Sequence, residues 1–330
     1  MKISKIVVGA ALLLISLLSF SQTKTISVGS PGPGSIAFVW ISSFSTALVQ
    51  TQSPVRIKVT AGIYDNEAMR IMEDNKPGID GSFVSGSSLV NAGLGRPPFQ
   101  GAPLSNIKAL FPLGQAPVGV VVRADSGIKT LKDLNGKRIS AGPAGQGSDF
   151  FARAFFKQVV PNVAVTHVPL SFQQFAPALQ DKRVDALFTL GAPPYPAIIE
   201  ASALTDVSFV KISDQEMHEW LKDNPQHHKM IVPKGTYPKQ TDDLVSLGHV
   251  SHLIVSGSLD QNTAYVLTKA WLDAGFKKSL IEASSSWTWA YSGFESGLYW
   301  EDLISLKIKL HPGAVKAYRE ANIKIPAELI

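Results

Sequence analysis

The sequence predicts an α/β fold with two similar lobes, and three observations support this prediction. Segments typical of strands and helices alternate along most of the chain. A strand, a glycine-rich turn and a helix follow one another twice, at residues 25–49 and 138–159. The chain has 330 residues, which is enough for two domains. With 45% hydrophobic and 17% charged residues, it can bury two cores and is not of the disordered class.

The first part of the chain reads as five strands and two helices. The segment VRIKVT alternates apolar and polar residues, which indicates a half-buried strand. The segment VGVVVR has little polarity, which indicates a strand covered on both faces. The predicted strands are residues 25–28, 55–60, 81–85, 107–113 and 118–123, and the predicted helices are 35–49 and 66–74.

The alternation continues in the second part of the chain. A short helix begins at 131–134, the predicted strands are 138–141, 163–169, 186–190 and 250–256, and the longer helices are 150–159, 172–180 and 260–274. Pro312 suits the first turn of a further helix. We interpret the aromatic residues of 287–300 mainly as core, with a pocket lining as the alternative.

The N-terminus is expected to be a secretory signal peptide of 21 residues. Lys2 and Lys5 precede an apolar run at 6–18, and small residues surround a cleavage point after Ser21. An uncleaved anchor is the alternative, but the run is short for a bilayer. We therefore expect the remaining chain to work in the periplasm.

Cysteine content and charge exclude several functions. The sequence has no cysteine, which excludes disulfides, thiol catalysis and a lipid anchor on cysteine. The net charge of +5 becomes +3 without the two lysines of the signal peptide, and no basic run occurs. Nucleic acid is therefore not an expected partner.

The first glycine loop, GPGSIA at residues 32–37, matches the G-x-G-x-x-A pattern of dinucleotide-binding folds. That function also needs an acidic residue after the second strand, and none occurs before Asp65. Two prolines in and beside the loop further reduce its N–H donors. We therefore predict no NAD and no other cofactor. The loop can still hold an anion on Gly34 and Ser35, or be a plain turn with Ser35 as helix cap.

The second glycine loop, GPAGQGSD at residues 142–149, has the same local chemistry. Gly145 and Gly147 allow a ligand to approach the backbone closely. Ser148 or Asp149 is expected to cap the helix, and Asp149 can alternatively accept a hydrogen bond from a ligand ammonium group. The two loops together predict two helix N-termini that converge on one small anion.

Other polar residues give no catalytic pattern. His218, His227 and His228 have no zinc-ligand spacing, and the residues 86–88 read as a turn without a histidine partner. We predict no enzyme and no metal site. Arg123 ends an apolar strand, where it can pair with a ligand carboxylate or with a protein acid.

An ordered set of motifs resembles the solute-binding proteins of TRAP transporters, in particular the TAXI group. The motifs are VRADSGI at 122–128, LKDLNGKR at 131–138, GPAGQGS at 142–148, QDKRVDALF at 180–188, PKGTYP at 233–238, and LHPGA at 310–314 leading into YRE at 318–320. The resemblance covers nearly all of the chain beyond the signal peptide.

This resemblance implies a two-lobed periplasmic binding protein fold, type II-like, with two doubly wound α/β domains joined by hinge strands. Lobe 1 would be residues 22–120 with 230–330, and lobe 2 residues 121–229. The protein would be a monomer that captures a small organic anion, such as a dicarboxylate, an oxo acid or a glutamate-like amino acid, and delivers it to the membrane subunits of a TRAP permease. An ABC importer or a sensor kinase is the alternative partner, and a secreted enzyme on this fold is a remote alternative.

The resemblance also implies a ligand site at five loops. The residues are Gly34, Ser35, Ile36, Gly62, Tyr64, Asn66, Ser85, Ser87, Gly145, Gln146, Gly147, Ser148, Ala192, Pro193 and Tyr195. The acid that the family usually has near Ser85 and Ser87 is missing here, which favours a ligand without an amine. Asp65 or Asp149 can compensate for that loss.

Overall fold

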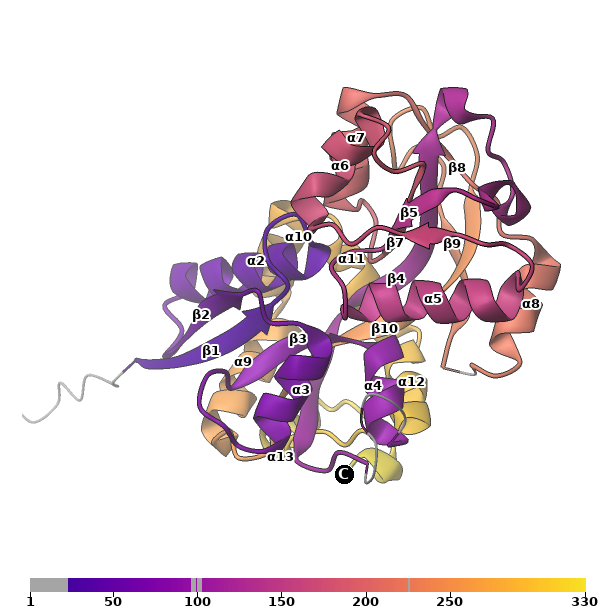
Figure 1. Cartoon of the computed structure of the whole chain (residues 1–330). Helices are drawn as coiled ribbons and strands as arrows, with labels where there is room; N and C mark the ends of the chain where they lie inside the picture. The colour runs from indigo at the N-terminus through magenta and orange to yellow at the C-terminus, as the bar shows by residue number, and fades with distance from the viewer. Residues whose placement is uncertain (1–22, 96–98, 100–102, 225) are drawn as a thin grey trace, which may run out of the picture.

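The computed structural model describes residues 23–95, 99, 103–224 and 226–330. The predicted signal peptide lies outside the described residues. The described chain forms two α/β lobes that share two long strands (Figure 1). We define lobe 1 by strands β1 to β3 and lobe 2 by strands β5 to β7. The residue boundaries predicted for the lobes stay a prediction.

The sheet of lobe 1 has the strand order β2-β1-β3-β10-β4. Its strands are β1 (Lys24–Ser30), β2 (Val55–Ala61), β3 (Gly81–Ser85), β4 (Ile107–Arg123) and β10 (Leu244–Ser256). β1 lies parallel to β2 and β3, whereas β10 lies antiparallel to β3 and β4. Its first helices are α2 (Ile36–Gln50), α3 (Asp65–Glu73) and α4 (Gly86–Gly93). Each follows a parallel strand, so all three begin at the carboxyl edge of the sheet.

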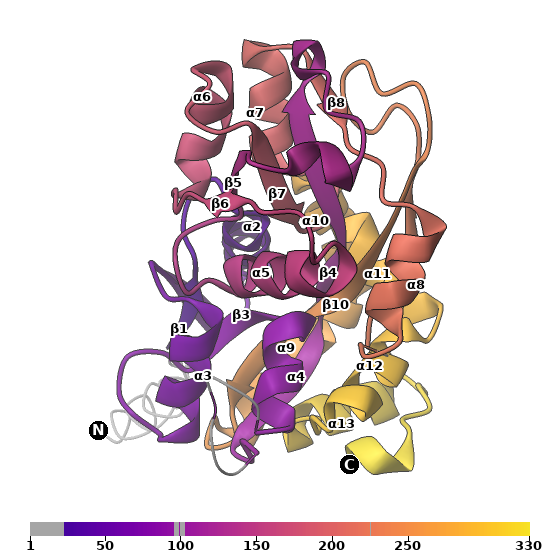
Figure 2. The same ribbon diagram turned by 45° about the vertical axis from the view of Figure 1, so that its right-hand side comes forward.

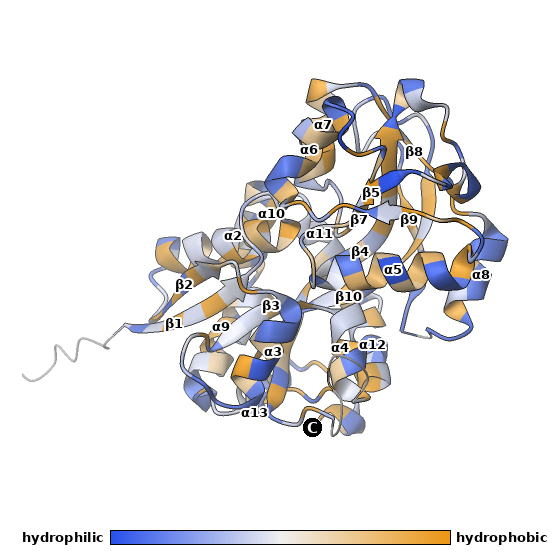
Figure 3. Ribbon diagram, viewed as in Figure 1, coloured by the Kyte–Doolittle hydropathy of each residue, from blue (hydrophilic) through white to orange (hydrophobic). Residues whose placement is uncertain are grey.

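The sheet of lobe 2 continues from β4 in the order β4-β7-β5-β6. Its strands are β5 (Arg138–Ser140), β6 (Thr166–His167) and β7 (Ala186–Leu190), with β8 (Val207–Phe209) on β4 and β9 (His228–Val232) on β10. Its helices are α5 (Gly147–Val159), α6 (Phe175–Gln180), α7 (Pro196–Leu204) and α8 (Asp214–Leu221). The part of β4 in this lobe is hydrophobic, whereas α3, α5 and α8 alternate hydrophobic and hydrophilic surface (Figure 3).

The last part of the chain returns to lobe 1 and adds five helices. They are α9 (Gln261–Leu272), α10 (Ala274–Ala283), α11 (Trp287–Glu295), α12 (Leu298–Leu306) and α13 (Pro312–Glu320). The aromatic side chains of 287–300 belong mainly to the core, as predicted: Trp287 packs against Trp40 of α2, Tyr291 and Tyr299 are buried, and the others are partly buried against them. His252 of β10 and Asp302 of α12 are both buried, and His252 Nε2 lies 2.6 Å from Asp302 Oδ2.

The predictions for two elements were wrong. The strands expected at 107–113 and 118–123 are one continuous strand, β4. The proline and glycine residues between them read as breaks, but β10 pairs with β4 across this region and keeps it extended. The turn expected at 86–88 is the first turn of α4.

β4 and β10 therefore cross between the lobes side by side. Gly114 faces Ser251 and Pro117 faces Gly248 in this antiparallel pair. His249 lies between those positions, is fully buried and packs against His227 with ring centroids 5.4 Å apart. The ring nitrogens of both histidines have no hydrogen-bond partner among the described residues.

Candidate ligand-binding site

The first glycine loop makes a tight entry into α2. Gly32 and Gly34 have left-handed φ angles of 122° and 85°. Ser35 is the N-cap of α2, because its Oγ accepts a hydrogen bond from Phe38 N at 3.2 Å and donates one to Gly32 O at 2.7 Å. The capping role considered for Ser35 is confirmed. A Cβ at Gly34 would lie 2.9 Å from the backbone nitrogen of Gln173 in lobe 2, so the loop is at the contact between the lobes.

The second glycine loop makes a similar entry into α5. Ser148 Oγ donates a hydrogen bond to Ala141 O, at the end of β5. Gln146 is the N-cap residue and is buried, but its side-chain Oε1 has no partner among the described residues. Gly147 faces lobe 1, since a Cβ there would lie 2.6 Å from Ser88 Oγ. α5 lies across α4 at this point (Figures 1 and 2).

The start of α4 is capped by an acid from another element. Asp65 Oδ2 accepts hydrogen bonds from Ser85 N at 3.1 Å, Ser85 Oγ at 2.5 Å and Ser88 Oγ at 2.9 Å. Asp65 is only 1% exposed, and its burial raises the pKa of the carboxyl despite these hydrogen bonds. Ser87 Oγ lies 3.2 Å from Ser85 Oγ. An acid therefore does lie beside Ser85 and Ser87, namely Asp65 at the start of α3.

The loop after β7 completes the contact between the lobes. Ala192 and Tyr195 are buried, and Gly191 packs against both Tyr195 and Ile36 of α2. The backbone N–H of Tyr195 donates a hydrogen bond to the hydroxyl of Tyr237 at 3.1 Å. This contact fixes the residue before α7.

The remaining predicted residues lie at the rim. A Cβ at Gly62 would have no other heavy atom within 4 Å, so this position is open. Tyr64, Asn66 and Gly145 line an open groove of about 450 Å³ between the lobes. Asn66 also borders, with Ser87 and Gly147, a small cavity of about 90 Å³. Pro193 lines a larger cavity of about 500 Å³ in lobe 2.

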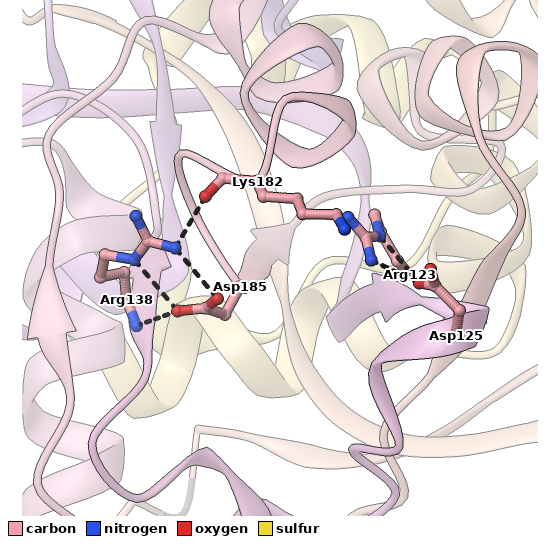
Figure 4. Close-up of polar contacts among 5 residues, drawn as sticks. All are labelled: Arg123, Asp125, Arg138, Lys182 and Asp185. Carbon is pink, nitrogen blue, oxygen red and sulfur yellow. Dashed lines mark hydrogen bonds and ion pairs between the residues drawn. The ribbon is translucent and has the colours of Figure 1, made fainter.

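The two charged residues considered for the site have protein partners. Arg123 Nε and Nη2 bind Asp125 Oδ1 at 2.8 and 2.6 Å (Figure 4). Arg123 follows Val122, which pairs with the first residue of β7, so it lies at the opposite end of β7 from the loop described above. Asp149 binds Arg153 Nε at 3.1 Å through both oxygens. The structure therefore favours the protein-acid alternative for Arg123.

Several buried polar atoms around the contact lack a hydrogen-bond partner among the described residues. They are Ser30 Oγ, Asp65 Oδ1, Ser140 Oγ, Gln146 Oε1 and Ser251 Oγ. Ser30 and Ser140 end β1 and β5, and Ser251 lies opposite Ser85 in the sheet. Buried polar groups are normally paired, so this concentration indicates a site for a polar molecule. Sequence patterns did not reveal these serines, because they lie in ordinary strands.

No group of three or more His, Asp or Glu residues in the described part of the chain could hold a metal ion. No helix among the described residues is long and apolar enough to cross a membrane.

Two α/β lobes around a pair of crossing strands, with the first lobe ordered β2-β1-β3-β10-β4, define the periplasmic binding protein type II fold. The chain belongs to the NMT1-like family, whose model matches residues 28–321. MatC from Rhodopseudomonas palustris with bound malate is similar over 84% of this chain and 89% of its own, at 14% identity and a TM-score of 0.50. The predicted fold class is confirmed.

Two further solved structures resemble the chain slightly less closely. One is described as a periplasmic transporter, with 11% identity, a TM-score of 0.49, and coverage of 84% of this chain and 98% of that chain. The other is lactococcal OpuAC in a closed form complexed with glycine betaine, with 15% identity, a TM-score of 0.47, and coverage of 84% and 99%.

Proposed function

We propose that the protein is an extracytoplasmic solute-binding protein that captures a small organic anion between its lobes. The observation that carries the proposal is the meeting of helix N-termini from both lobes around unpaired, buried polar atoms. α2 and α4 begin on the lobe 1 side, and α5 and α7 begin on the lobe 2 side. The first turn of a helix has N–H groups without an intrahelical partner and a partial charge of roughly +0.5, which favours a carboxylate. α7 begins with Pro196 and therefore offers fewer donors than α2, α4 and α5.

The close contacts between the lobes support a closing motion. Gly34, Gly147 and Gly191 each approach a residue of the opposite lobe more closely than a side chain would allow. The lobes, predicted as residues 22–120 with 230–330 and residues 121–229, would separate to admit the ligand and close around it. The cavity of about 90 Å³ beside Gly147 is smaller than the roughly 300 Å³ of common ligand pockets, so a ligand of ordinary size would fit there only with the lobes further apart.

We further propose that the ligand is delivered to a TRAP-type permease, after removal of residues 1–21. The motif set of the TAXI group supports the transporter type, and the malate bound to MatC supports an organic acid as ligand. An ABC importer or a sensor kinase would be an alternative partner on the same fold. Uptake by reconstituted permease that needs an ion gradient and no ATP would support the TRAP partner, whereas a need for ATP would exclude it.

A thermal-shift screen tests the capture of an organic anion. The protein is unfolded, washed free of carried ligand, refolded and screened against carboxylic acids, amino acids, sugars and polyamines. A true ligand at about a hundred times its Kd adds about 2.7 kcal/mol to the free energy of unfolding. We expect stabilisation by a carboxylate. Stabilisation by a sugar or a polyamine alone would contradict the proposal.

A further inference from the structure

The two carboxylate oxygens of Asp65 differ in their hydrogen bonding at the contact between the lobes. Oδ2 accepts all three of the hydrogen bonds that the structure gives this side chain. Oδ1 is buried and has no partner among the described residues, and the whole residue is 1% exposed. A carboxylate has acceptor sites for about four donors, so the acceptor capacity of Oδ1 is unused.

The surroundings of Asp65 offer dipoles but no full positive charge. Its donors are the Ser85 backbone and the hydroxyls of Ser85 and Ser88, which are neutral groups. The N-termini of α4 and α5 add partial positive charge. None of the ion pairs found among residues 23–95, 99, 103–224 and 226–330 includes Asp65. A buried carboxylate in this state is costly unless it takes up a proton or a cation joins it.

Asp65 lies where a ligand would be when the lobes open. A Cβ at Gly147 of lobe 2 would lie 2.8 Å from Asp65 Oδ2, so the carboxylate is at the contact surface itself. The cavity of about 90 Å³ borders the same place, between Ser88 and Gly147. Separation of the lobes at Gly147 would expose the carboxylate to an entering molecule.

We propose that Asp65 is a specificity-determining residue that accepts a hydrogen bond from an ammonium group of the ligand. The ligand would then be an amino acid, with its carboxylate at the helix N-termini and its ammonium group at Oδ1. The inference rests on the proposed function and narrows its ligand class. It reverses the sequence-based preference for an amine-free acid, which depended on the absence of an acid near Ser85.

A charged donor fits this position better than a neutral one. The helix N-termini satisfy a ligand carboxylate, but they leave the Asp65 carboxylate as a second negative charge in the same closed space. Two buried negative groups repel each other strongly when water is excluded. An ammonium group between them removes this repulsion, whereas a hydroxyl or keto oxygen does not.

The test compares acids that share a carbon skeleton and differ in the amine. Isothermal titration of the refolded protein uses L-alanine and propionate, L-aspartate and succinate, and L-glutamate and glutarate. We expect the amino acid of at least one pair to bind at least 10-fold tighter than its partner, in the range of about 10- to 150-fold that a hydrogen bond to a charged group supplies. In Asp65→Asn the ratio should fall to about threefold or less.

Asp74→Asn is the matched control, because Asp74 is an exposed acid at the C-cap of the same helix. It should keep the wild-type ratio. The preference for amino acids over amine-free acids is measured on the wild-type protein itself. A folding defect in Asp65→Asn would therefore not prevent this part of the test. Amine-free acids that bind wild type as tightly as amino acids, or a ratio that survives Asp65→Asn, would overturn the inference while leaving the proposed function intact. If none of the six compounds binds, this inference fails, whereas the proposed function stands if another organic anion stabilises the protein in the thermal-shift screen.

Discussion

Replacing Gly147 by alanine should obstruct closure without harming either lobe. A Cβ at this position would lie 2.6 Å from Ser88 Oγ, 2.8 Å from Asp65 Oδ2 and 2.9 Å from Ser85 Oγ, all in the opposite lobe. Gly147 does not have a left-handed φ, so alanine fits the local backbone. Forcing a methyl group into such a contact costs about 1–3 kcal/mol. Because only the closed form has this contact, the Kd should rise about 5- to 150-fold.

Three measurements separate obstruction from damage to the fold. The free energy of unfolding without ligand should stay unchanged or rise slightly, since alanine is the better helix former. Titration with the solute that stabilises wild type most should show the higher Kd. X-ray scattering at saturating solute should show a larger radius of gyration than wild type. Gly275→Ala, near the start of α10, is the control and should change neither the Kd nor the radius of gyration. A Kd within twofold of wild type, with equal compaction, would refute the reasoning.

Three further predictions concern buried polar groups. Asp302→Ala should lower the free energy of unfolding by about 3–5 kcal/mol, because it leaves His252 buried without its partner. Urea unfolding measures this loss, and a value below about 1 kcal/mol would contradict the prediction. Burial lowers the pKa of His227 to about 3, so the unfolded chain binds this proton more readily and stability falls as the pH drops from about 6.5 toward 3. His227→Phe should therefore recover about 2–3 kcal/mol at pH 4.5 relative to pH 7, as measured by urea unfolding at both values. Tyr237→Phe removes the acceptor for the Tyr195 N–H and should lower the free energy of unfolding by about 1–3 kcal/mol. Hydrogen exchange at the Tyr195 amide should become faster, and unchanged exchange would contradict the contact.

Local patterns predicted most of the fold, and they failed where a distant partner decides the structure. β1, β2 and β3 were predicted within a residue or so at most ends, because their hydrophobicity and flanking turns are local signals. The continuity of β4 depends on its pairing with β10, more than 120 residues later, and no local signal shows this. The start of α4 depends in the same way on Asp65, which caps it from another helix.

The candidate site shows the same division. The glycine loops at Gly34 and Gly147 were recognised from sequence, because a strand, a glycine turn and a helix make a local pattern. The partner of Asp149 is Arg153, four residues along the same helix, and that spacing could have indicated it. The position of Asp65 beside Ser85 could not be predicted, since α3 was expected to begin one residue later. The contact joins the start of α3 to the end of β3, 20 residues further along the chain.

The paired crossing of β4 and β10 has a consequence for the kinetics of capture. Two hydrogen-bonded strands leave the lobes far fewer relative orientations than a flexible tether would, so an open molecule already presents both surfaces to a solute. Association should then be limited by diffusion and by the lifetime of the open form, while dissociation is limited by the rate at which the pair of strands bends open. Gly114, Pro117 and Gly248 lie where the pair passes between the lobes, and glycine and proline weaken a strand pair most. The residence time of the solute should therefore depend on how easily this strand pair bends, more than the encounter rate does.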